Sequence, residues 1–453
     1  MINKFDLEKI GEEMYELIRE LYPINRSITG DGVRKTLKIL QKKIELKIHE
    51  VPSGTNVFDW TIPQEWNIND AYILNSKNEK IVDFQKSNLH VLQYSIPIKA
   101  RIKLDELKNH IYTLPKQPKN IPYITSFYSK NWGFCMSHNE FLKLKDDEYF
   151  VYIDSKLTDG SLTYGEYLIK GKTDEEVLIS TYVCHPSLCN DNLSGPVLAT
   201  ILAKYLSKHD IYYSIRFLFI PETVGAITWL SINEDKIKNI AHGLVATCLG
   251  DSGISTYKKS RDGNNIIDKI VEEVLIESGE PYKILDFWPS GSDERQYCSP
   301  AFNLPIGSLM RTPYDMFNEY HTSADNLDFV RKDCLSNSFS KYLSVIHKLE
   351  KNHDNFKRKK SVLGNKETSK DDPVFINLFP KCEPQLGKRS VYENIGGQKD
   401  QEQLKKKKGI QWILNFSDGK HSLRDIEKKS KLDYDLLLSM ADLLNEKKLL
   451  SEI

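Results

Sequence analysis

Between residues 160 and 335, apolar runs of strand length alternate with longer runs of helical periodicity, and this alternation constrains the fold more than any other feature. The strand-like runs are EEVLIST, SIRFLFI, HGLVATCLG and PIGSLMR, and the helical runs include LSGPVLATILAKYLSKH and NNIIDKIVEEVLIESG. Strand, helix, strand in this order is typical of crossover connections, which build parallel sheets covered by helices. The sequence therefore predicts an α/β fold.

The flanking sequence predicts two further units. From 57 to 150, short β-branched and aromatic runs such as NVFDWTI, AYILN and YFVYID are broken by turn residues, which indicates a small inserted β-rich domain. Residues 351–372 are charged and poor in apolar residues, which indicates an exposed linker. Residues 373–453 contain short helical patterns that resemble a winged helix, and we expect a hairpin at their end. The α/β domain would then be discontinuous, comprising residues 1–56 and 151–350.

Charge and composition argue against several classes of protein. Lys and Arg total 63, as do Asp and Glu, so no net field directs the chain to nucleic acid or to an anionic membrane. No segment approaches the roughly 18 to 20 apolar residues that span a bilayer, and the amphipathic start does not resemble a signal peptide. The seven cysteines have no repeating spacing, which argues against a disulfide framework. We therefore expect a cytoplasmic protein with reduced thiols and no membrane partner.

Polar side chains that could bind a metal follow the strands of the predicted sheet. His185 and Asp191 come after EEVLIST, Glu222 comes directly after SIRFLFI, and His321 lies downstream of PIGSLMR. Ligands collect where the strands of an α/β sheet end, so these side chains are placed to form one site. Two imidazoles and a carboxylate suit catalytic zinc. The alternatives are ordinary ones: surface histidines, Asp191 as a helix cap, and Glu222 as a carboxylate at a helix start.

Three motifs, CHPSLCNDNLSG, FIPETVGA and EYHTSADN, resemble the metal-site segments of the zinc aminopeptidases of the bacterial leucyl-aminopeptidase type. With RSITGDG, GSDERQY and RTPYDMFNEYH, nearly the whole chain resembles bacterial aminopeptidase-like proteins that carry an inserted β domain and a C-terminal winged helix. The resemblance implies a phosphorylase/hydrolase-like zinc-peptidase sheet. It also implies that His185, Asp191 and His321 bind metal.

The sequence departs from the two-zinc pattern of that family at both outer ligands. Where the family has adjacent glutamates, a general base followed by a ligand, this chain has Glu222 and Thr223. Where the family has a further Asp ligand, this chain has Thr247 or Cys248. The resemblance therefore implies one Zn²⁺ per chain. Asp251 lies a few residues after the position at which the family has that Asp ligand. A second metal bound by Asp251 therefore remains an alternative.

The implied reaction is attack of a zinc-activated water on an amide carbonyl, with Glu222 as the general base. Arg295, Arg311 and Tyr320 are candidates for binding substrate or the oxyanion, and the arginines could instead form ordinary salt bridges. Glu294 in GSDERQY is the next candidate for the base and a further candidate for substrate contact. The expected substrate is a small peptide or an aminoacylated conjugate.

The predicted winged helix raises a second class of function. Residues 401–453 contain eleven Lys and Arg against nine Asp and Glu, and the presumed recognition helix, DYDLLLSMADLLNEKK, begins with acidic residues. A DNA-reading helix needs a basic face, so we expect docking or homo-oligomer formation instead of nucleic-acid binding. The alternative to a hydrolase is a catalytically idle scaffold or a DNA-binding protein. An intact Glu222 beside complete ligands favours the enzyme.

Overall fold

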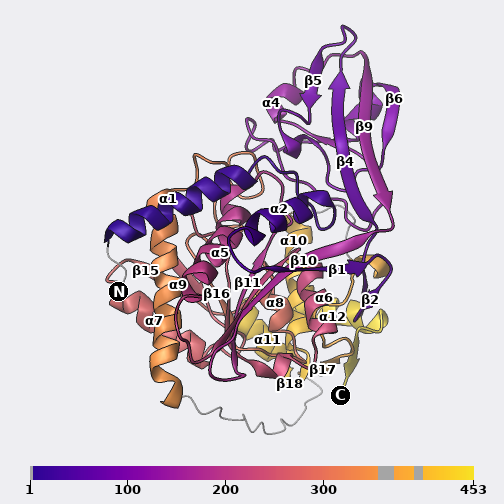
Figure 1. Ribbon diagram of the computed structural model, residues 1–453. Helices are drawn as coiled ribbons and strands as arrows, with labels where there is room; N and C mark the ends of the chain where they lie inside the picture. Colours follow the sequence, from indigo (N-terminus) through magenta and orange to yellow (C-terminus); the bar gives the residue numbers. More distant parts are fainter. Residues whose placement is uncertain (1–3, 356–371, 392–400) are drawn as a thin grey trace.

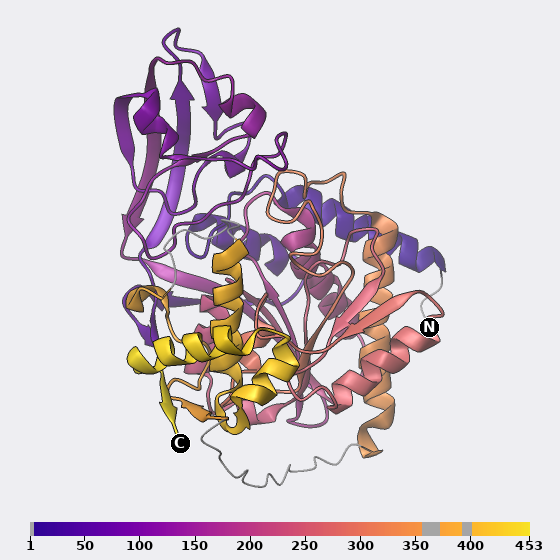
Figure 2. The same ribbon diagram turned by 180° about the vertical axis from the view of Figure 1, so that it is seen from behind.

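The computed structural model describes residues 4–355, 372–391 and 401–453 (Figures 1 and 2). Its N-terminal elements are α1 (Lys4–Leu21), α2 (Asp31–Gln41), β1 (Lys47–Pro52), β2 (Asn56–Val57) and β3 (Trp60–Thr61). Helices α1 and α2 bury one apolar face each against the α/β core, while their charged residues lie outward, as expected of amphipathic surface helices.

Eight of the described strands form the central sheet, in the order β1-β10-β12-β11-β13-β16-β14-β15. Those not yet introduced are β10 (Ser161–Ile169), β11 (Glu176–Tyr182), β12 (Ser214–Ile220), β13 (Ile240–Val245), β14 (Ser255–Lys258), β15 (Tyr282–Leu285) and β16 (Ile306–Met310). The neighbours β12, β11, β13 and β16 run parallel, as the crossover pattern predicts. All residues of β11 and β12 are buried, which explains their continuous apolar runs.

Helices cover both faces of this sheet (Figures 1 and 2). One face packs against α1, α2, α5 (Ser194–Leu206), α7 (Ile266–Glu277) and α9 (Lys332–Asn352). The other face packs against α6 (Val224–Ile232), α8 (Glu294–Tyr297) and the C-terminal domain. Alternate residues of β12 join the two cores: Phe217 faces the first and Leu218 the second. The period of two is that of a strand buried on both sides.

The β-rich unit projects from one end of the molecule (Figure 1). In the described chain, β5-β4-β9-β6 form its main sheet, with β4 (Glu65–Leu74), β5 (Lys80–Asp83), β6 (Ile98–Lys103) and β9 (Glu148–Thr158). Smaller elements are η1 (Asn88–His90), α3 (Leu104–Lys108), β7 (Ile111–Tyr112), β8 (Phe134–Cys135) and α4 (His138–Phe141). Strand β9 continues past residue 150, where the sequence placed the end of the insertion.

The C-terminal domain contains β17 (Val374–Asn377), η5 (Gly387–Arg389), α10 (Gln401–Phe416), β18 (Asp418–Ser422), α11 (Leu423–Ser430), α12 (Tyr434–Glu446) and β19 (Leu450–Glu452). The expected terminal hairpin is wrong, because β19 pairs with β17, which precedes the helices. The first residues of the expected linker, 351–355, form the end of α9 and the short turn η4 (His353–Asn355). Residues 356–371 lie outside the described part of the chain. No described helix is both long and apolar enough to cross a membrane.

Candidate metal centre

The side chains predicted at strand ends meet at the carboxyl edge of the parallel strands. His185 follows β11 and Glu222 follows β12, each after a short turn. Asp191 lies in the turn η2 (Cys189–Leu193) that leads into α5, and His321 comes from the loop between β16 and α9. The fold therefore brings segments that are far apart in the sequence, those of Asp191 and His321, into direct contact.

Both imidazoles approach the same carboxylate oxygen. Asp191 Oδ2 lies 3.0 Å from His321 Nε2 and 3.7 Å from His185 Nε2. Ligand atoms of His185, Asp191 and His321 all lie within 4.8 Å of one another. We call these residues the triad. Within the described residues, the triad is the group of His, Cys, Asp or Glu side chains that could hold a metal ion.

The triad fits a zinc ion. Two ligands of tetrahedral zinc, each about 2.0–2.1 Å from the metal, are about 3.4 Å apart, close to the spacings of the triad. Asp191 Oδ2 and His321 Nε2 are buried atoms without a partner of hydrogen-bond geometry among the described residues, as expected of atoms that a cation satisfies. Burial lowers the pKa of His185 to about 4, so its ring is neutral near pH 7 and keeps a lone pair for a metal.

Glu222 lies beside the triad without joining it. Its Oε2 is 3.8 Å from His185 Nε2, and its side chain is 25% exposed. The backbone N–H of Glu222 donates to Cys184 Sγ at 3.2 Å, which fixes the turn after β12. Burial raises the pKa of Glu222 well above its ordinary value, and the carboxylates of Asp293 and Asp191 raise it further. The position and the raised pKa suit a group that takes up and releases a proton.

Asp325 holds the turn that carries Asp191. Its Oδ1 accepts the backbone N–H groups of Cys189 at 3.2 Å and Asn190 at 2.6 Å, and its Oδ2 accepts that of Asp191 at 2.8 Å. Asp325 is fully buried. From the other side, the Tyr182 hydroxyl donates to Asp191 Oδ1. Backbone and side chain of Asp191 are therefore both fixed by partners outside the triad.

Arg26 fixes the turn that carries His185. The guanidinium is fully buried and donates to the carbonyl oxygens of His185 at 2.7 Å, Pro186 at 2.6 Å and Leu21 at 2.6 Å. Burial lowers the pKa of Arg26 to about 10, which leaves the side chain charged near neutral pH. Arg26 therefore acts on the site through the backbone of His185.

The inserted domain supplies an aromatic wall to the triad. The ring of Tyr123 lies 5.1 Å from that of His185 and 5.0 Å from that of His321, between centroids. The backbone N–H of Tyr123 also donates to the carbonyl of His321 at 2.8 Å. The inserted domain therefore helps to orient His321, whose own loop has no regular structure.

Thr223 takes the place of the second glutamate of the two-zinc pattern and is occupied by other contacts. Its backbone N–H donates to Asp293 Oδ1 at 2.6 Å, and its hydroxyl accepts from Arg295 Nη2 at 2.8 Å. A hydroxyl in this position offers no carboxylate to a second metal.

Asp251, the alternative ligand for a second metal, lies outside the triad. Its carboxylate accepts hydrogen bonds from Asn190 Nδ2 at 3.0 Å, from the Thr312 hydroxyl at 2.6 Å and from the Gly253 N–H at 2.6 Å. Burial raises the pKa of Cys248 well above its ordinary value, so this thiol is a poor source of a thiolate ligand. The geometry favours one metal.

A cavity of about 630 Å³ opens over the triad, and Arg295 lines it. The other residues predicted to contact substrate, Arg311, Tyr320 and Glu294, do not line the cavity. The ring of Tyr320 stacks on His321 at 4.0 Å, and Arg311 donates to Asn337 at 3.0 Å. Glu294 is fully buried and pairs with Lys258 Nζ at 2.6 Å, so burial in the core takes it away from substrate.

Sequence reasoning missed two residues that shape the site. Asp325 lies four positions after His321 in the motif EYHTSADN, and that motif was the available signal. Tyr123 has no local signal, because its role depends on how the inserted domain docks.

Comparison with known proteins places the chain in a family. A family model described as "Domain of unknown function (DUF4910)" matches residues 15–352. The chain belongs to the DUF4910 family. A second model, described as a winged helix-turn-helix, matches residues 373–452. The DUF4910 match covers the α/β domain together with its insertion, and the second covers the C-terminal domain.

Two of the matches, one a curated protein and one a solved structure, come from Clostridium acetobutylicum. One, 53% identical over 453 residues and 99% of each chain, is described as "Putative polysaccharide biosynthesis protein with aminopeptidase-like domain". A solved structure described as a "putative peptidase" is 52% identical and has a TM-score of 0.75. The match covers 99% of this chain and 98% of that one.

A zinc aminopeptidase from Bacillus subtilis shares the fold of this DUF4910 protein. Its solved structure is 11% identical, with a TM-score of 0.57, and the match covers 76% of this chain and 96% of that one. The predicted α/β zinc-aminopeptidase fold with a C-terminal winged helix is confirmed.

Proposed function

We propose that this protein is a zinc-dependent amide hydrolase, an aminopeptidase or a related enzyme, with one Zn²⁺ held by His185, Asp191 and His321. The observation that carries the proposal is the convergence of these three ligand atoms beside Glu222. The aminopeptidase-like fold supports it. A scaffold that had lost catalysis would not need a base beside a complete ligand set.

Bound zinc would act as a Lewis acid that lowers the pKa of a water molecule and polarises the substrate carbonyl. Glu222 would accept a proton from that water and return it to the leaving amine. The ring of Tyr123 packs against both imidazoles.

We propose a small peptide or aminoacylated conjugate as the substrate. The cavity of about 630 Å³ is of a size that suits a small ligand. The relative described as a polysaccharide biosynthesis protein with an aminopeptidase-like domain supports a sugar conjugate as one form of that substrate. Arg295, on the wall of the cavity, is our candidate for contact with it.

The winged helix does not take part in nucleic-acid binding in this proposal. The exposed residues of α12 and its N-cap include Asp433, Asp435, Asp442 and Glu446, which would repel phosphates. We propose instead that the C-terminal domain serves the enzyme or its self-association, and that the protein works in the cytoplasm.

Glu222→Gln tests the proposal. As a base outside the ligand set, Glu222 should be dispensable for zinc, so the variant should keep its metal and lose activity on aminoacyl amides by at least about 10²-fold. Glu234→Gln is the matched control, because Glu234 is exposed and lies just beyond α6 on the same segment. Loss of zinc from Glu222→Gln would make Glu222 a ligand, and an unchanged rate would exclude it as the base.

A further inference from the structure

The C-terminal domain forms one wall of the cavity over the triad. Glu383, Gln385, Gly387, Lys388 and Lys407 line the cavity and belong to this domain. The aromatic part of the lining, which includes Trp60, Tyr123, Phe127 and Tyr128, comes from the inserted domain and the β2–β3 hairpin. The winged helix is therefore built into the candidate active site.

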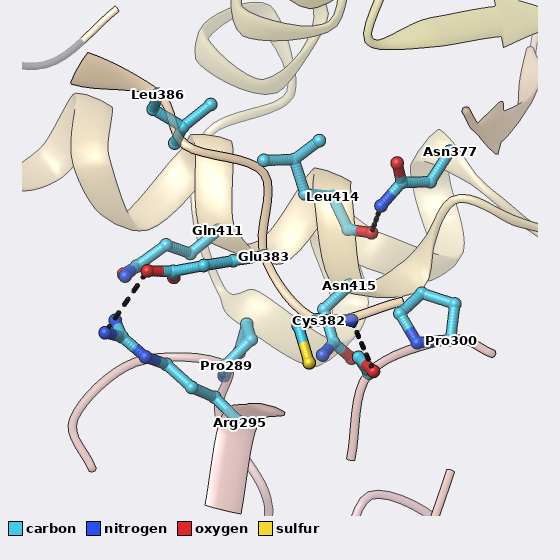
Figure 3. A pocket seen from close by; sticks show the side chains of 11 residues that line it. Pro289, Arg295, Pro300, Asn377, Cys382, Glu383, Leu386, Gln411, Leu414 and Asn415 are labelled. Carbon is cyan, nitrogen blue, oxygen red and sulfur yellow. Dashed lines mark hydrogen bonds and ion pairs between the residues drawn. The ribbon is translucent and has the colours of Figure 1, made fainter. Parts of the chain in front are cut away.

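Specific contacts hold this wall in place. Figure 3 is a close-up of a separate pocket that shares Arg295 and Glu383 with this cavity, and it shows the ion pair between these two residues. Their charged groups are 3.4 Å apart. Arg295 also donates to the Thr223 hydroxyl at 2.8 Å, so the wall is connected to the residue next to Glu222. The indole N–H of Trp60 donates to the carbonyl of Glu383 at 2.8 Å, which joins the wall to the hairpin.

The wall carries net positive charge. Charged side chains on it or directly paired with it include Arg295, Lys388, Arg389, Lys407, Asp59 and Glu383. Four of these are cations and two are carboxylates, and Glu222 adds a third carboxylate to the cavity lining. Asp59 pairs with both Lys388, at 2.7 Å, and Arg389, at 2.5 Å, and Glu383 pairs with Arg295.

Lys407 is the cation of this wall that α10 presents to the cavity. The residue is exposed and lines the cavity. The charges of Arg295, Glu383, Asp315 and Glu222 all act on it. Lys405 and Lys408 on the same helix are exposed but do not line the cavity. The helix therefore aims one of its consecutive lysines at the space above the triad.

Part of the cavity lining is aromatic. Trp60 and Tyr128 pack edge to face with centroids 5.5 Å apart, and Phe127 lines the cavity beside them. A substrate that fills the cavity therefore meets both aromatic rings and cationic side chains. An acidic substrate brings a charge complementary to these cations, and a neutral peptide brings none.

We propose that Lys407 binds an anionic oxygen group, a carboxylate or a phosphate, on the part of the substrate remote from the scissile amide. The C-terminal domain thereby selects acidic conjugates, and this inference rests on the proposed zinc site. An ammonium is a point charge suited to either anion, so the two sources must be separated by experiment.

The test uses the zinc-loaded full chain and isothermal titration calorimetry. The probes are straight-chain hydroxamic acids of four to six carbons that end in a carboxylate, a phosphonate or an uncharged carboxamide. Each hydroxamate anchors on the metal, and the chain length varies the reach to Lys407. Lys407→Gln is the variant, and Lys405→Gln is the control with the same loss of charge on the same helix.

The expected result is that wild type and Lys405→Gln bind an acidic probe at least about tenfold more tightly than the carboxamide of equal length, and that Lys407→Gln loses this preference. Whichever acid shows the larger preference identifies the anion. Equal binding of acidic and neutral probes by wild type would overturn the inference while leaving the zinc site intact, and so would a preference kept in Lys407→Gln. Failure of every probe to bind would contradict the zinc site itself.

Discussion

Asp325→Asn should weaken zinc binding although Asp325 is not a ligand. Both carboxylate oxygens accept backbone N–H groups from the turn that carries Asp191, at 2.6 to 3.2 Å. Asparagine has one acceptor oxygen, and its NH₂ group would face at least one of these N–H donors. A buried N–H left without an acceptor costs about 1–3 kcal/mol.

The substitution should have two measurable effects, one on zinc affinity and one on stability. Displacing Asp191 should lower zinc affinity by about 10- to 100-fold, the usual range for residues that orient a ligand. Competition against a chromophoric chelator measures this affinity, and urea unfolding of the metal-free protein measures the change in stability separately. Asp328→Asn is the control, since Asp328 is exposed in the same loop. Zinc affinity and stability of Asp325→Asn equal to those of the control would refute the positioning role of Asp325.

Two further predictions concern charged pairs outside the site. Lys258→Met should lower the free energy of unfolding by about 3–5 kcal/mol, because it leaves the buried carboxylate of Glu294 without its cationic partner. Adding Glu294→Gln should recover part of this loss, and urea unfolding measures both effects. Hydrogen bonds from Arg34 lower the pKa of Glu65 to about 2, from an ordinary value of 4.5, so the stability it contributes is present above about pH 4.5 and is lost as pH falls toward 2. Unfolding of Glu65→Gln should accordingly depend less steeply on pH over that window, and an unchanged slope would contradict the assignment.

The positions of His185 and Glu222 could be predicted because they depend on local pattern. Each follows an apolar run that is too short for a buried helix, and the carboxyl ends of parallel strands meet at one edge. Asp191 followed from the same argument, since its turn connects β11 to α5.

Long-range contacts could not be predicted in this way. The carboxylate of Glu294 turns to Lys258, which lies on β14, and nothing in GSDERQY indicates that partner. Lys407 lies in a lysine run that reads as a solvated helix surface, and its place in the cavity depends on how a separate domain packs against the α/β core. The final strand β19 pairs with β17, which precedes α10, α11 and α12 in the chain. This pairing takes the place of the expected hairpin.

The zinc-to-protein ratio of the purified full chain tests the central claim most directly. It is measured by elemental mass spectrometry after dialysis against trace zinc. With His185, Asp191 and His321 as the ligand set, the ratio should be close to one, and His185→Ala combined with His321→Ala should reduce it to background. A ratio near two, a ratio near zero for the wild type, or full occupancy in the double variant would contradict the account.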